Sequence, residues 1–174
     1  MAMMFIRWRP RTVLSPVVGH LNGVAQSMYI HGEALIHVTR HQQRGAWATE
    51  AGGQLFGSVS EEAVRIVAAT GPYMGDERSR YRYRSNPQSA QAAISRSARV
   101  GLLYLGEWHT HAEDEPELSG SDEDAITTLR ARSKLNASAV VLLIVGRAEP
   151  PRGLAVYSCD GQTPVKWTLS CGEA

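Results

Sequence analysis

Two histidines, His109 and His111, lie one residue apart, and a dense acidic run leads from them to Asp122. The chain of 174 residues holds only six histidines, so this pair is the first candidate for a metal site. Alternation along a strand would place both imidazoles on one face, where they could bind Zn²⁺ together with ligands from elsewhere. The alternative is a pair of exposed histidines on an edge strand. An isolated H-x-H is too short to decide between the two.

Ser119 and Asp122 add two polar groups close behind the histidines. On a helix beginning at the intervening glycine, Asp122 shares a stripe with Ile126 and Leu129, which should face the core. A carboxylate on an inward stripe is costly unless it is paired or binds a metal, so Asp122 is a candidate third ligand. Ser119 also fits the N-cap of that helix, because S-x-x-D resembles a capping box. A capping serine still offers its hydroxyl to a nearby site.

Together these residues form the pattern H-T-H, seven residues, Ser, two residues, Asp, which resembles the signature of the JAMM (MPN+) zinc metalloproteases. Four residue types at three fixed spacings make a specific match. The family also has a glutamate upstream, just ahead of a Gly-Gly pair and a strand. Glu50 in EAGGQLFG stands in the matching place, about sixty residues before the histidines. The resemblance covers roughly residues 33 to 157, and Ala112 departs from the proline common in the family.

The resemblance implies a ligand set and a mechanism. His109, His111 and Asp122 would hold one Zn²⁺ per chain, with the fourth position open to water as in catalytic zinc sites. Glu50 would take a proton from this water and later pass it to the leaving amine. Ser119 would donate a hydrogen bond to the oxyanion. The implied reaction is hydrolysis of the amide between a protein C-terminus and a lysine or another amine.

The stretch YLGEWHTH, followed by an acidic turn with a proline, is similar to the small bacterial JAMM deconjugases of CBASS-type anti-phage and mobile-element operons. This similarity implies a protein substrate, a ubiquitin-like or CBASS-type conjugate. Two alternatives stay open. A JAMM peptidase that trims a sulfur-carrier or ubiquitin-like precursor would use the same catalytic residues, whereas a non-catalytic MPN scaffold would be a binding module of the same fold. The complete set of five site residues counts against the scaffold.

An alternation of arginine and tyrosine, ERSRYRYRS, precedes this region. In related proteins the segment flanks the cleft and can clamp an extended tail by strand addition, which makes Arg80, Arg82 and Tyr83 candidate substrate-binding residues. Single-stranded nucleic acid is the other ligand of such a pattern. One short patch and a net charge of +1 argue against nucleic acid.

Other polar residues receive plainer interpretations. His37 and His41 have the i, i+4 spacing of a helical zinc site but lack the glutamate of H-E-x-x-H, so we expect polar helix residues. Glu107 is a candidate hydrogen-bond acceptor for one of the site histidines. The acidic residues between 113 and 117 are expected to form a solvated loop.

The elements that must position these groups belong to a mixed α and β chain without repeats. Strand patterns occupy residues 52–59, 63–70, 102–111, 139–146 and 153–159, and helical patterns occupy residues 33–43, 88–98 and 121–135. The first two strands should form a hairpin, and residues 71–87 read as irregular. In the 102–111 strand, alternation groups Leu103, Leu105 and Glu107 with the histidines, and Trp108 with Thr110 on the other face.

We therefore expect an α+β (mixed α/β) fold. The resemblance makes it a single MPN/JAMM-type domain, with a twisted mixed sheet flanked by helices. Residues 31–174 would form this domain, and residues 1–30 would be an unassigned N-terminal arm or edge strand.

Composition excludes several classes of protein. Hydrophobic residues make up 43% of the chain and charged residues 20%, as in ordinary globular proteins. No stretch approaches the roughly 20 apolar residues of a membrane helix, and the N-terminus lacks the apolar core of a signal peptide. A cytoplasmic protein is expected. Cys159 and Cys171 should then be free, buried thiols.

Overall fold

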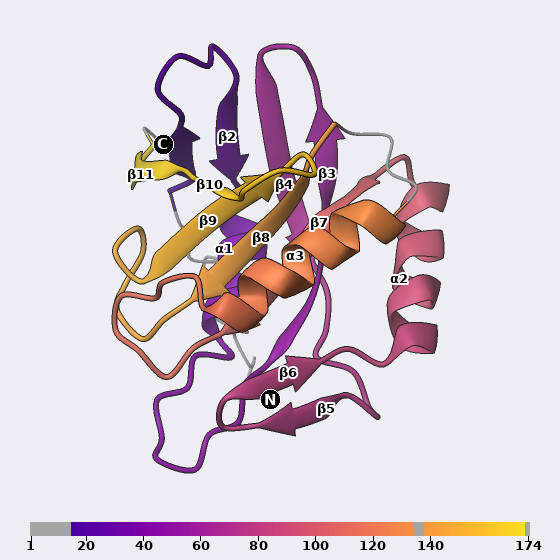
Figure 1. Ribbon diagram of the computed structural model, residues 1–174, viewed down its shortest axis with the longest axis vertical. Coiled ribbons are helices and arrows are strands. Elements are labelled where there is room, and N and C mark those ends of the chain that lie inside the picture. Colours follow the sequence, from indigo (N-terminus) through magenta and orange to yellow (C-terminus); the bar gives the residue numbers. More distant parts are fainter. Residues whose placement is uncertain (1–14, 134–137, 173–174) are drawn as a thin grey trace, which may run out of the picture.

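A computed structural model describes residues 15–133 and 138–172, and its body is one nine-stranded twisted sheet (Figure 1). The strand order is β10-β9-β8-β7-β3-β4-β2-β1-β11. The β2–β4 and β7–β8 pairs are parallel and the others are antiparallel, so the sheet is mixed. The strands are β1 (Val17–His20), β2 (Ser27–Ile30), β3 (Gly52–Val59), β4 (Ala63–Ala69), β7 (Leu103–Thr110), β8 (Val140–Val145), β9 (Leu154–Cys159), β10 (Val165–Lys166) and β11 (Thr168–Cys171).

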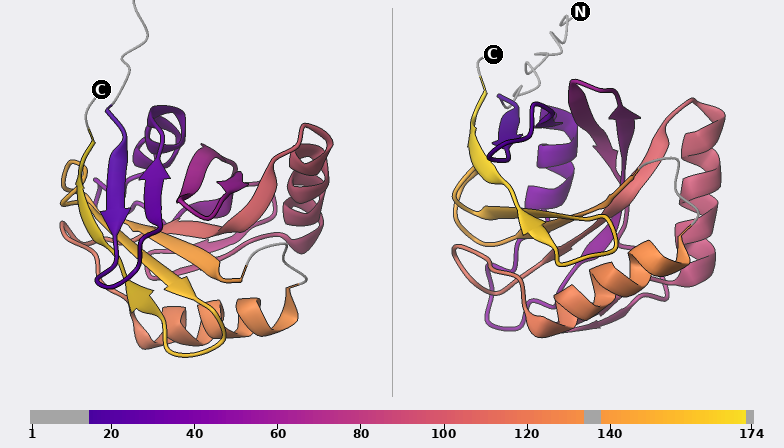
Figure 2. Two further views of the ribbon diagram at one scale, coloured as in Figure 1. Left: turned by 90° about the horizontal axis from the view of Figure 1, so that it is seen from above. Right: turned by 45° about the horizontal axis from the view of Figure 1, so that its top comes forward.

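Helices cover both faces of this sheet, which gives the expected mixed α and β single domain. The helices are α1 (Gly32–Thr39), α2 (Pro87–Arg99) and α3 (Gly120–Arg132). Figure 2 shows α1 and α3 on opposite faces, and α2 beside the end of β7. The α2 helix begins where the sequence provides a cap, because the Asn86 side chain accepts a hydrogen bond from Ser89 N and Pro87 occupies the first turn.

The strand β8 lies between two cores, which explains its unbroken apolar sequence. Alternate residues beginning at Val141 pack into the core that includes α1, while those beginning at Val140 pack with Ile126 of α3. All six side chains are buried. A strand covered on both faces has no polar side, so it reads as a continuous hydrophobic run.

Most predicted elements are confirmed, because their signals are local. The strand β3 has the expected bounds, and it forms the expected antiparallel hairpin with β4. The α1 helix ends at Thr39, four residues before the predicted end, and Gln42 and Gln43 then turn into the protein interior.

The prediction that residues 71–87 are irregular is wrong. Two short strands, β5 (Glu77–Ser79) and β6 (Arg82–Arg84), pair antiparallel there as a separate hairpin, with Glu77 opposite Arg84. The hairpin lies below the main sheet in Figure 1. Most of its side chains are exposed, so the segment lacks the apolar alternation by which strands are recognised.

The strand β7 carries a bulge that changes which side chains share a face. Its pairing with β3 passes from Gly106 to Tyr104 and skips Leu105. Leu105 and Leu103 therefore pack in the same core as Trp108, and not on the face of the histidines as predicted. An extra residue in one strand reverses the alternation beyond it. Gly106 has φ +149°, and a side chain there would collide with the Val141 carbonyl.

Two further expectations concern the chain ends. Cys159 is buried but Cys171 is exposed, so the prediction of two buried thiols holds for only one, and both are free. β1 and β2 belong to the main sheet, β1 pairing with β11. Residues 1–14 lie outside the described residues, and the domain boundary at residue 31 stays a prediction.

No helix in residues 15–133 and 138–172 has the length and apolar character needed to cross a bilayer.

Candidate metal centre

The histidine pair sits at the end of β7, in the middle of the sheet. His109 lies between Gly52 of β3 and Ile144 of β8. His111 follows the last residue of the strand, and its backbone N–H donates to the Val145 carbonyl at 2.9 Å. Strands on both sides hold this segment, so the two imidazoles project from a rigid base.

The α3 helix brings Asp122 to the histidines. Its N-cap is Ser119, whose hydroxyl oxygen accepts from Asp122 N at 3.3 Å, while Ser119 N donates to Asp122 Oδ2 at 2.9 Å. This is the predicted capping box, and it fixes the direction of the carboxylate. Ile126, 2% exposed, packs into the core one turn later and anchors the helix as expected from the inward stripe.

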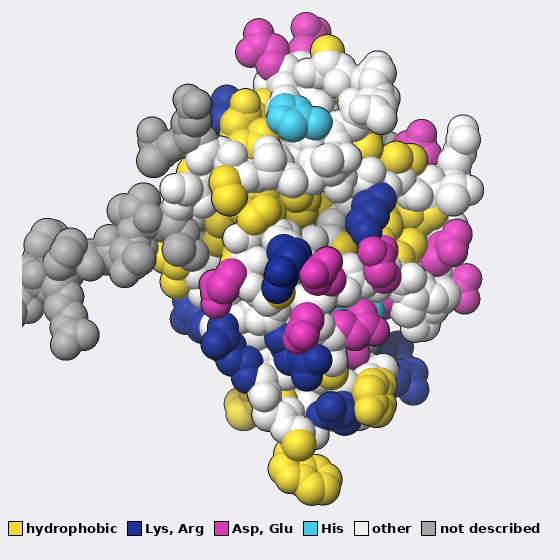
Figure 3. All heavy atoms as spheres, turned by 90° about the vertical axis from the view of Figure 1, so that its left-hand side faces the viewer, with side chains coloured by type: hydrophobic (Ala, Val, Ile, Leu, Met, Phe, Trp, Pro, Cys, Tyr) yellow, Lys and Arg dark blue, Asp and Glu magenta, His cyan; other side chains and the backbone are white. Residues whose placement is uncertain are grey.

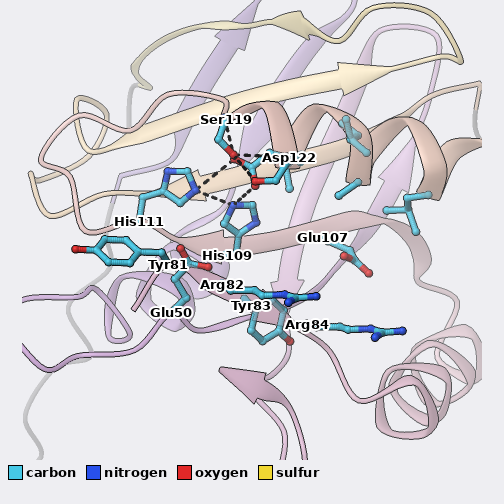
Figure 4. Close-up of a pocket in the computed structure, with 15 residues that line it drawn as sticks. Glu50, Tyr81, Arg82, Tyr83, Arg84, Glu107, His109, His111, Ser119 and Asp122 are labelled. Atoms are coloured by element: carbon cyan, nitrogen blue, oxygen red, sulfur yellow. Dashed lines mark hydrogen bonds and ion pairs between the residues drawn. The ribbon is translucent and has the colours of Figure 1, made fainter. Parts of the chain in front are cut away.

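His109, His111 and Asp122 meet at one point (Figure 4). The two imidazole Nε2 atoms are 3.1 Å apart. The Asp122 Oδ1 atom lies 3.2 Å from His109 Nε2, and Oδ2 lies 3.4 Å from His111 Nε2. Tetrahedral ligands of a zinc ion lie roughly 3.3 Å from one another, since each Zn–N or Zn–O distance is about 2.0–2.1 Å. The three residues therefore have the spacing and the donor types of a metal site.

Electrostatics keep this carboxylate ionised. Burial opposes ionisation of Asp122, but hydrogen bonds from both histidines outweigh it and lower the pKa of the carboxyl group. Burial likewise opposes the charged form of His111, yet the contact with Asp122 raises the pKa of the imidazole. A negative charge fixed beside two nitrogens favours a bound cation.

Glu50 lies on the wall of the same cleft, below His111 in Figure 4, and is 7% exposed. Burial raises the pKa of its carboxyl group to about 7, and the nearby charge of Asp122 adds to this rise. A cation at the three ligands would lower the pKa again. The two glycines after Glu50 leave no room for side chains, because one on Gly52 would collide with the Trp108 carbonyl and one on Gly53 with the Thr70 carbonyl.

The β5–β6 hairpin holds the main chain at Glu50. The Glu50 backbone N–H donates to Ser79 O at 2.8 Å, and the Arg78 guanidinium donates to the Glu50 carbonyl oxygen. Sequence reasoning missed this role, since neither contact involves the Glu50 side chain.

Gln43 is a second residue that sequence reasoning missed. It is 1% exposed, and its amide nitrogen donates to Ala48 O at 3.1 Å and to Arg80 O at 2.9 Å. Its amide oxygen accepts from Oγ1 of Thr110 at 3.3 Å, and Thr110 is the residue between His109 and His111 in the sequence. One buried side chain thus joins the segment before Glu50, the hairpin and the histidine strand. A glutamine after an amphipathic helix carries no signal of this kind.

A cleft of about 320 Å³ surrounds the site. The three ligands, Glu50 and Ser119 line it, as do two of the predicted substrate-binding residues, Arg82 and Tyr83. Arg80 does not line it, and its guanidinium donates to Ala46 O and to Tyr81 Oη. Tyr83 packs over Gly52 and donates to Asp76 Oδ2 at 3.2 Å, so part of its role is structural.

Glu107 was predicted to accept a hydrogen bond from one of the site histidines. Glu107 lines the cleft, but its hydrogen-bond partners are Gln54 and Tyr104, and burial raises its pKa. The expected contact with a site histidine is not among them. Instead, Glu113 Oε2 lies 3.8 Å from His111 Nδ1.

His37 lies in α1 as predicted, whereas His41 follows the end of that helix, and both are half-buried. Both rings pack against Trp108, with centroids 5.7 Å from its ring, on the far side of β7 from the site. His37 Nε2 also contacts the Gly71 carbonyl oxygen at 2.8 Å. Burial lowers the pKa of His41 to about 4, which keeps this ring neutral at neutral pH. They are packing residues of the core.

Comparison with known proteins finds relatives that are named for an activity. A 111-residue segment is 39% identical to a CD-NTase/cGAS isopeptidase of Pseudomonas aeruginosa, covering 62% of this chain and 70% of the relative. A protein of the same name from Enterobacter hormaechei is 32% identical over 103 residues, which cover 58% of this chain and 57% of that protein.

The fold has a solved counterpart in a solution structure of a Desulfitobacterium hafniense protein. Its TM-score is 0.59 at 16% identity, and the match covers 79% of this chain and 87% of that protein. The family model of prokaryotic homologues of the JAB domain matches residues 32–158, which include the three ligands, Glu50 and Ser119. The chain therefore belongs to the prokaryotic JAB-domain family, as its resemblance to the JAMM proteins indicated.

Proposed function

We propose that this protein is a zinc-dependent isopeptidase, which hydrolyses the amide between a protein C-terminus and a lysine or another amine. The observation that carries the proposal is the meeting of His109, His111 and Asp122 with a buried glutamate, Glu50, in one open cleft. The names of the relatives support a CD-NTase conjugate as substrate, and hence a deconjugating role in bacterial anti-phage defence.

The donor set fits zinc, since two imidazoles and one carboxylate leave one tetrahedral position for water or substrate. When bound, zinc supplies a Lewis acid that lowers the pKa of a water molecule to about 7. The residues of the chain then have to move one proton and stabilise one developing charge.

In the proposed reaction, Glu50 carries out the proton transfers. Its carboxylate faces the cleft beside His111 and accepts a proton from the attacking water. When the C–N bond breaks, the same carboxyl group returns the proton to the departing nitrogen, which leaves as a neutral amine. The carbonyl carbon keeps the oxygen from water, so a free carboxyl terminus results.

In the proposed reaction, Ser119 donates to the oxyanion, and its hydroxyl must rotate to do so. In the structure, Ser119 Oγ donates to Asp122 Oδ2 at 2.6 Å. A hydroxyl has one proton to donate, so a bond to the oxyanion replaces this contact. The serine backbone N–H continues to hold Asp122 during that rotation.

Metal content and cleavage together test this function. The wild type should contain about one zinc per chain by mass spectrometry and should cleave a CD-NTase joined through its C-terminus to a lysine. His109→Ala should lose both zinc and cleavage, whereas Glu50→Gln should keep zinc and lose cleavage. His20→Ala, which changes an exposed histidine outside the cleft, is the control.

Two outcomes would contradict the proposal. One is a wild type without metal after zinc is supplied. The other is a Glu50→Gln variant as active as the wild type. If the wild type binds zinc and cleaves only a linear precursor, the function is that of a trimming peptidase with the same catalytic residues.

A further inference from the structure

The cleft has two unlike ends. On one side of the candidate ligands it is lined by Arg82, Arg84 and Glu107 (Figure 4), and Leu129 of α3 belongs to the same lining. On the other side, Tyr81 extends past His111 at the mouth (Figure 4). The first end is lined by charged side chains, and the second opens onto the protein surface beside the exposed Tyr81 ring.

Two exposed aromatic residues stand at the open end. Trp47 is 96% exposed, in the loop of residues 44–49 that leads to Glu50, and Tyr81 is 77% exposed, in the turn of the β5–β6 hairpin. Hydrophobic side chains protrude at the lower edge of Figure 3, the end that carries the hairpin in Figure 1. Single exposed apolar residues need no explanation. These two, however, lie on loops that are joined.

Arg80 joins the two loops. Its guanidinium donates to the carbonyl of Ala46, next to Trp47, and to Tyr81 Oη at 3.0 Å. The same group lies 5.5 Å from the centre of the Tyr81 ring. Both aromatic residues therefore belong to one surface, built around a cation.

The loops beneath this surface are fixed before any partner binds. Gln43 donates to Ala48 O in the Trp47 loop and to Arg80 O in the hairpin turn, and it is itself buried. Glu50 N and Ser79 O form another bond between the same two segments. A partner that binds here loses little free energy to ordering of the loops.

We propose that Trp47, Arg80 and Tyr81 form a docking surface for the amine-bearing protein of the conjugate. The proposal rests on the proposed isopeptidase function, because an isopeptide bond joins two chains that must leave the scissile bond in different directions. The end lined by Arg82 and Arg84 takes the C-terminal tail, and the open end meets a folded surface. Aromatic residues and arginine dominate the binding energy of such interfaces.

Charge defines the partner further. The three residues of the docking surface include one cation, Arg80, and no carboxylate. A complementary partner presents carboxylates and an apolar side chain around the modified lysine. The docking surface thus selects conjugates by the protein that carries the amine.

Paired substrates test this selection. A CD-NTase tail is joined either to a lysine of a folded acidic carrier protein or to aminocoumarin, a small amine without a surface. In Trp47→Ala the ratio of kcat/KM for the protein conjugate to kcat/KM for the dye conjugate should fall about tenfold, the usual effect of losing one interface anchor. Val100→Ala, an exposed hydrophobic residue at the C-cap of α2, should leave this ratio as in the wild type.

The outcomes separate this proposal from the function itself. A wild type that cleaves neither substrate contradicts the isopeptidase function. An active wild type whose ratio is unchanged in Trp47→Ala overturns the docking surface. So does an equal loss on both substrates, which assigns Trp47 to the folding of the cleft, or a wild-type dimer that Trp47→Ala dissociates without altering the ratio. Circular dichroism of each variant identifies any that fails to fold.

Discussion

Two charged segments lie next to the cleft, the acidic loop of residues 113–117 and the β5–β6 hairpin. They differ in whether their charged side chains form ion pairs within the chain. In the acidic loop, three carboxylates pair with cations: Asp114 with Arg147 at 2.9 Å, Glu115 with Arg152 at 3.2 Å and Glu117 with Lys166 at 2.6 Å. Figure 3 shows acidic and basic side chains interleaved across this face. In the β5–β6 hairpin, Arg82 and Arg84 line the cleft, and neither has an ion pair within the described part of the chain.

The difference assigns the two segments different tasks. The acidic loop uses its side chains to fasten the approach to Ser119, since Tyr157 Oη also donates to Glu117 and accepts from Leu118 N. The hairpin fastens Glu50 mainly through main-chain oxygens, which leaves two guanidinium groups facing the cleft. Paired charges position the candidate catalytic residue Ser119, and unpaired charges are available to a substrate.

The largest loss of activity should come from a change at Ser119, the residue that follows the acidic loop and is positioned by it. In Ser119→Ala we expect kcat to fall about 100- to 1000-fold, because one oxyanion donor is lost. The backbone bond from residue 119 to Asp122 remains, so zinc content should stay near one per chain. Loss of the helix cap should also cost about 1 kcal/mol of stability.

Single-turnover kinetics, metal analysis and thermal unfolding measure the three quantities. A variant that loses zinc in parallel with activity would assign Ser119 a purely structural role as a helix cap. Ser121→Ala, which alters a neighbouring hydroxyl within 2.9 Å of Ser119 Oγ, is the matched control.

Unpaired arginines should give a smaller effect, on substrate binding. In the double variant Arg82→Ala, Arg84→Ala, KM for a protein conjugate should rise about tenfold at low salt, while zinc content stays constant, since neither guanidinium supports the ligands. The difference from the wild type should shrink as salt rises. Steady-state kinetics across a salt series measures this.

Arg152→Ala provides the comparison from the other flank, because it removes a charge whose partner is the exposed Glu115. It should leave KM close to the wild-type value. A loss of zinc in the hairpin variant, or an equal rise of KM in both variants, would erase the distinction between paired and unpaired charges.

Sequence reasoning could not have found that distinction. The three carboxylates with a basic partner find it 33 to 49 residues later in the chain, for example Asp114 with Arg147 and Glu117 with Lys166. The prediction of a solvated loop describes the exposure of these side chains but not their partners. Local patterns show that a charge is present, and only the fold decides whether it is neutralised.

The same contrast holds for the candidate site. The helix that carries Asp122 was predictable because its cap, stripe and charge pattern are local. The bulge that places Leu105 in the core depends on the register with β3, and the role of Gln43 depends on contacts with two segments far along the chain, at Arg80 and Thr110. The grouping of Glu50 with the histidines came from the family resemblance, since no local pattern links residues sixty positions apart.

The smallest effect should come from Glu117, and it depends on pH. Hydrogen bonds from Lys166 and then Tyr157 favour its charged form and lower the pKa of this carboxyl group. A group with a lower pKa in the folded state stabilises the protein above its unfolded value of about 4.3, and this contribution disappears as pH falls through the folded pKa. The side chain is exposed, so the pair contributes at most about 1 kcal/mol.

Thermal unfolding of Glu117→Gln measures that contribution. At pH 7 the variant should have a Tm lower than the wild type by no more than about 4 °C. The two curves should converge once the pH lies below the folded pKa, because the wild-type carboxyl group is then protonated and as uncharged as the glutamine. Glu61→Gln, an exposed residue in the β3–β4 turn, is the control. An equal difference at both pH values would mean that Glu117 acts by packing, and that the acidic loop is fastened by something other than its charges.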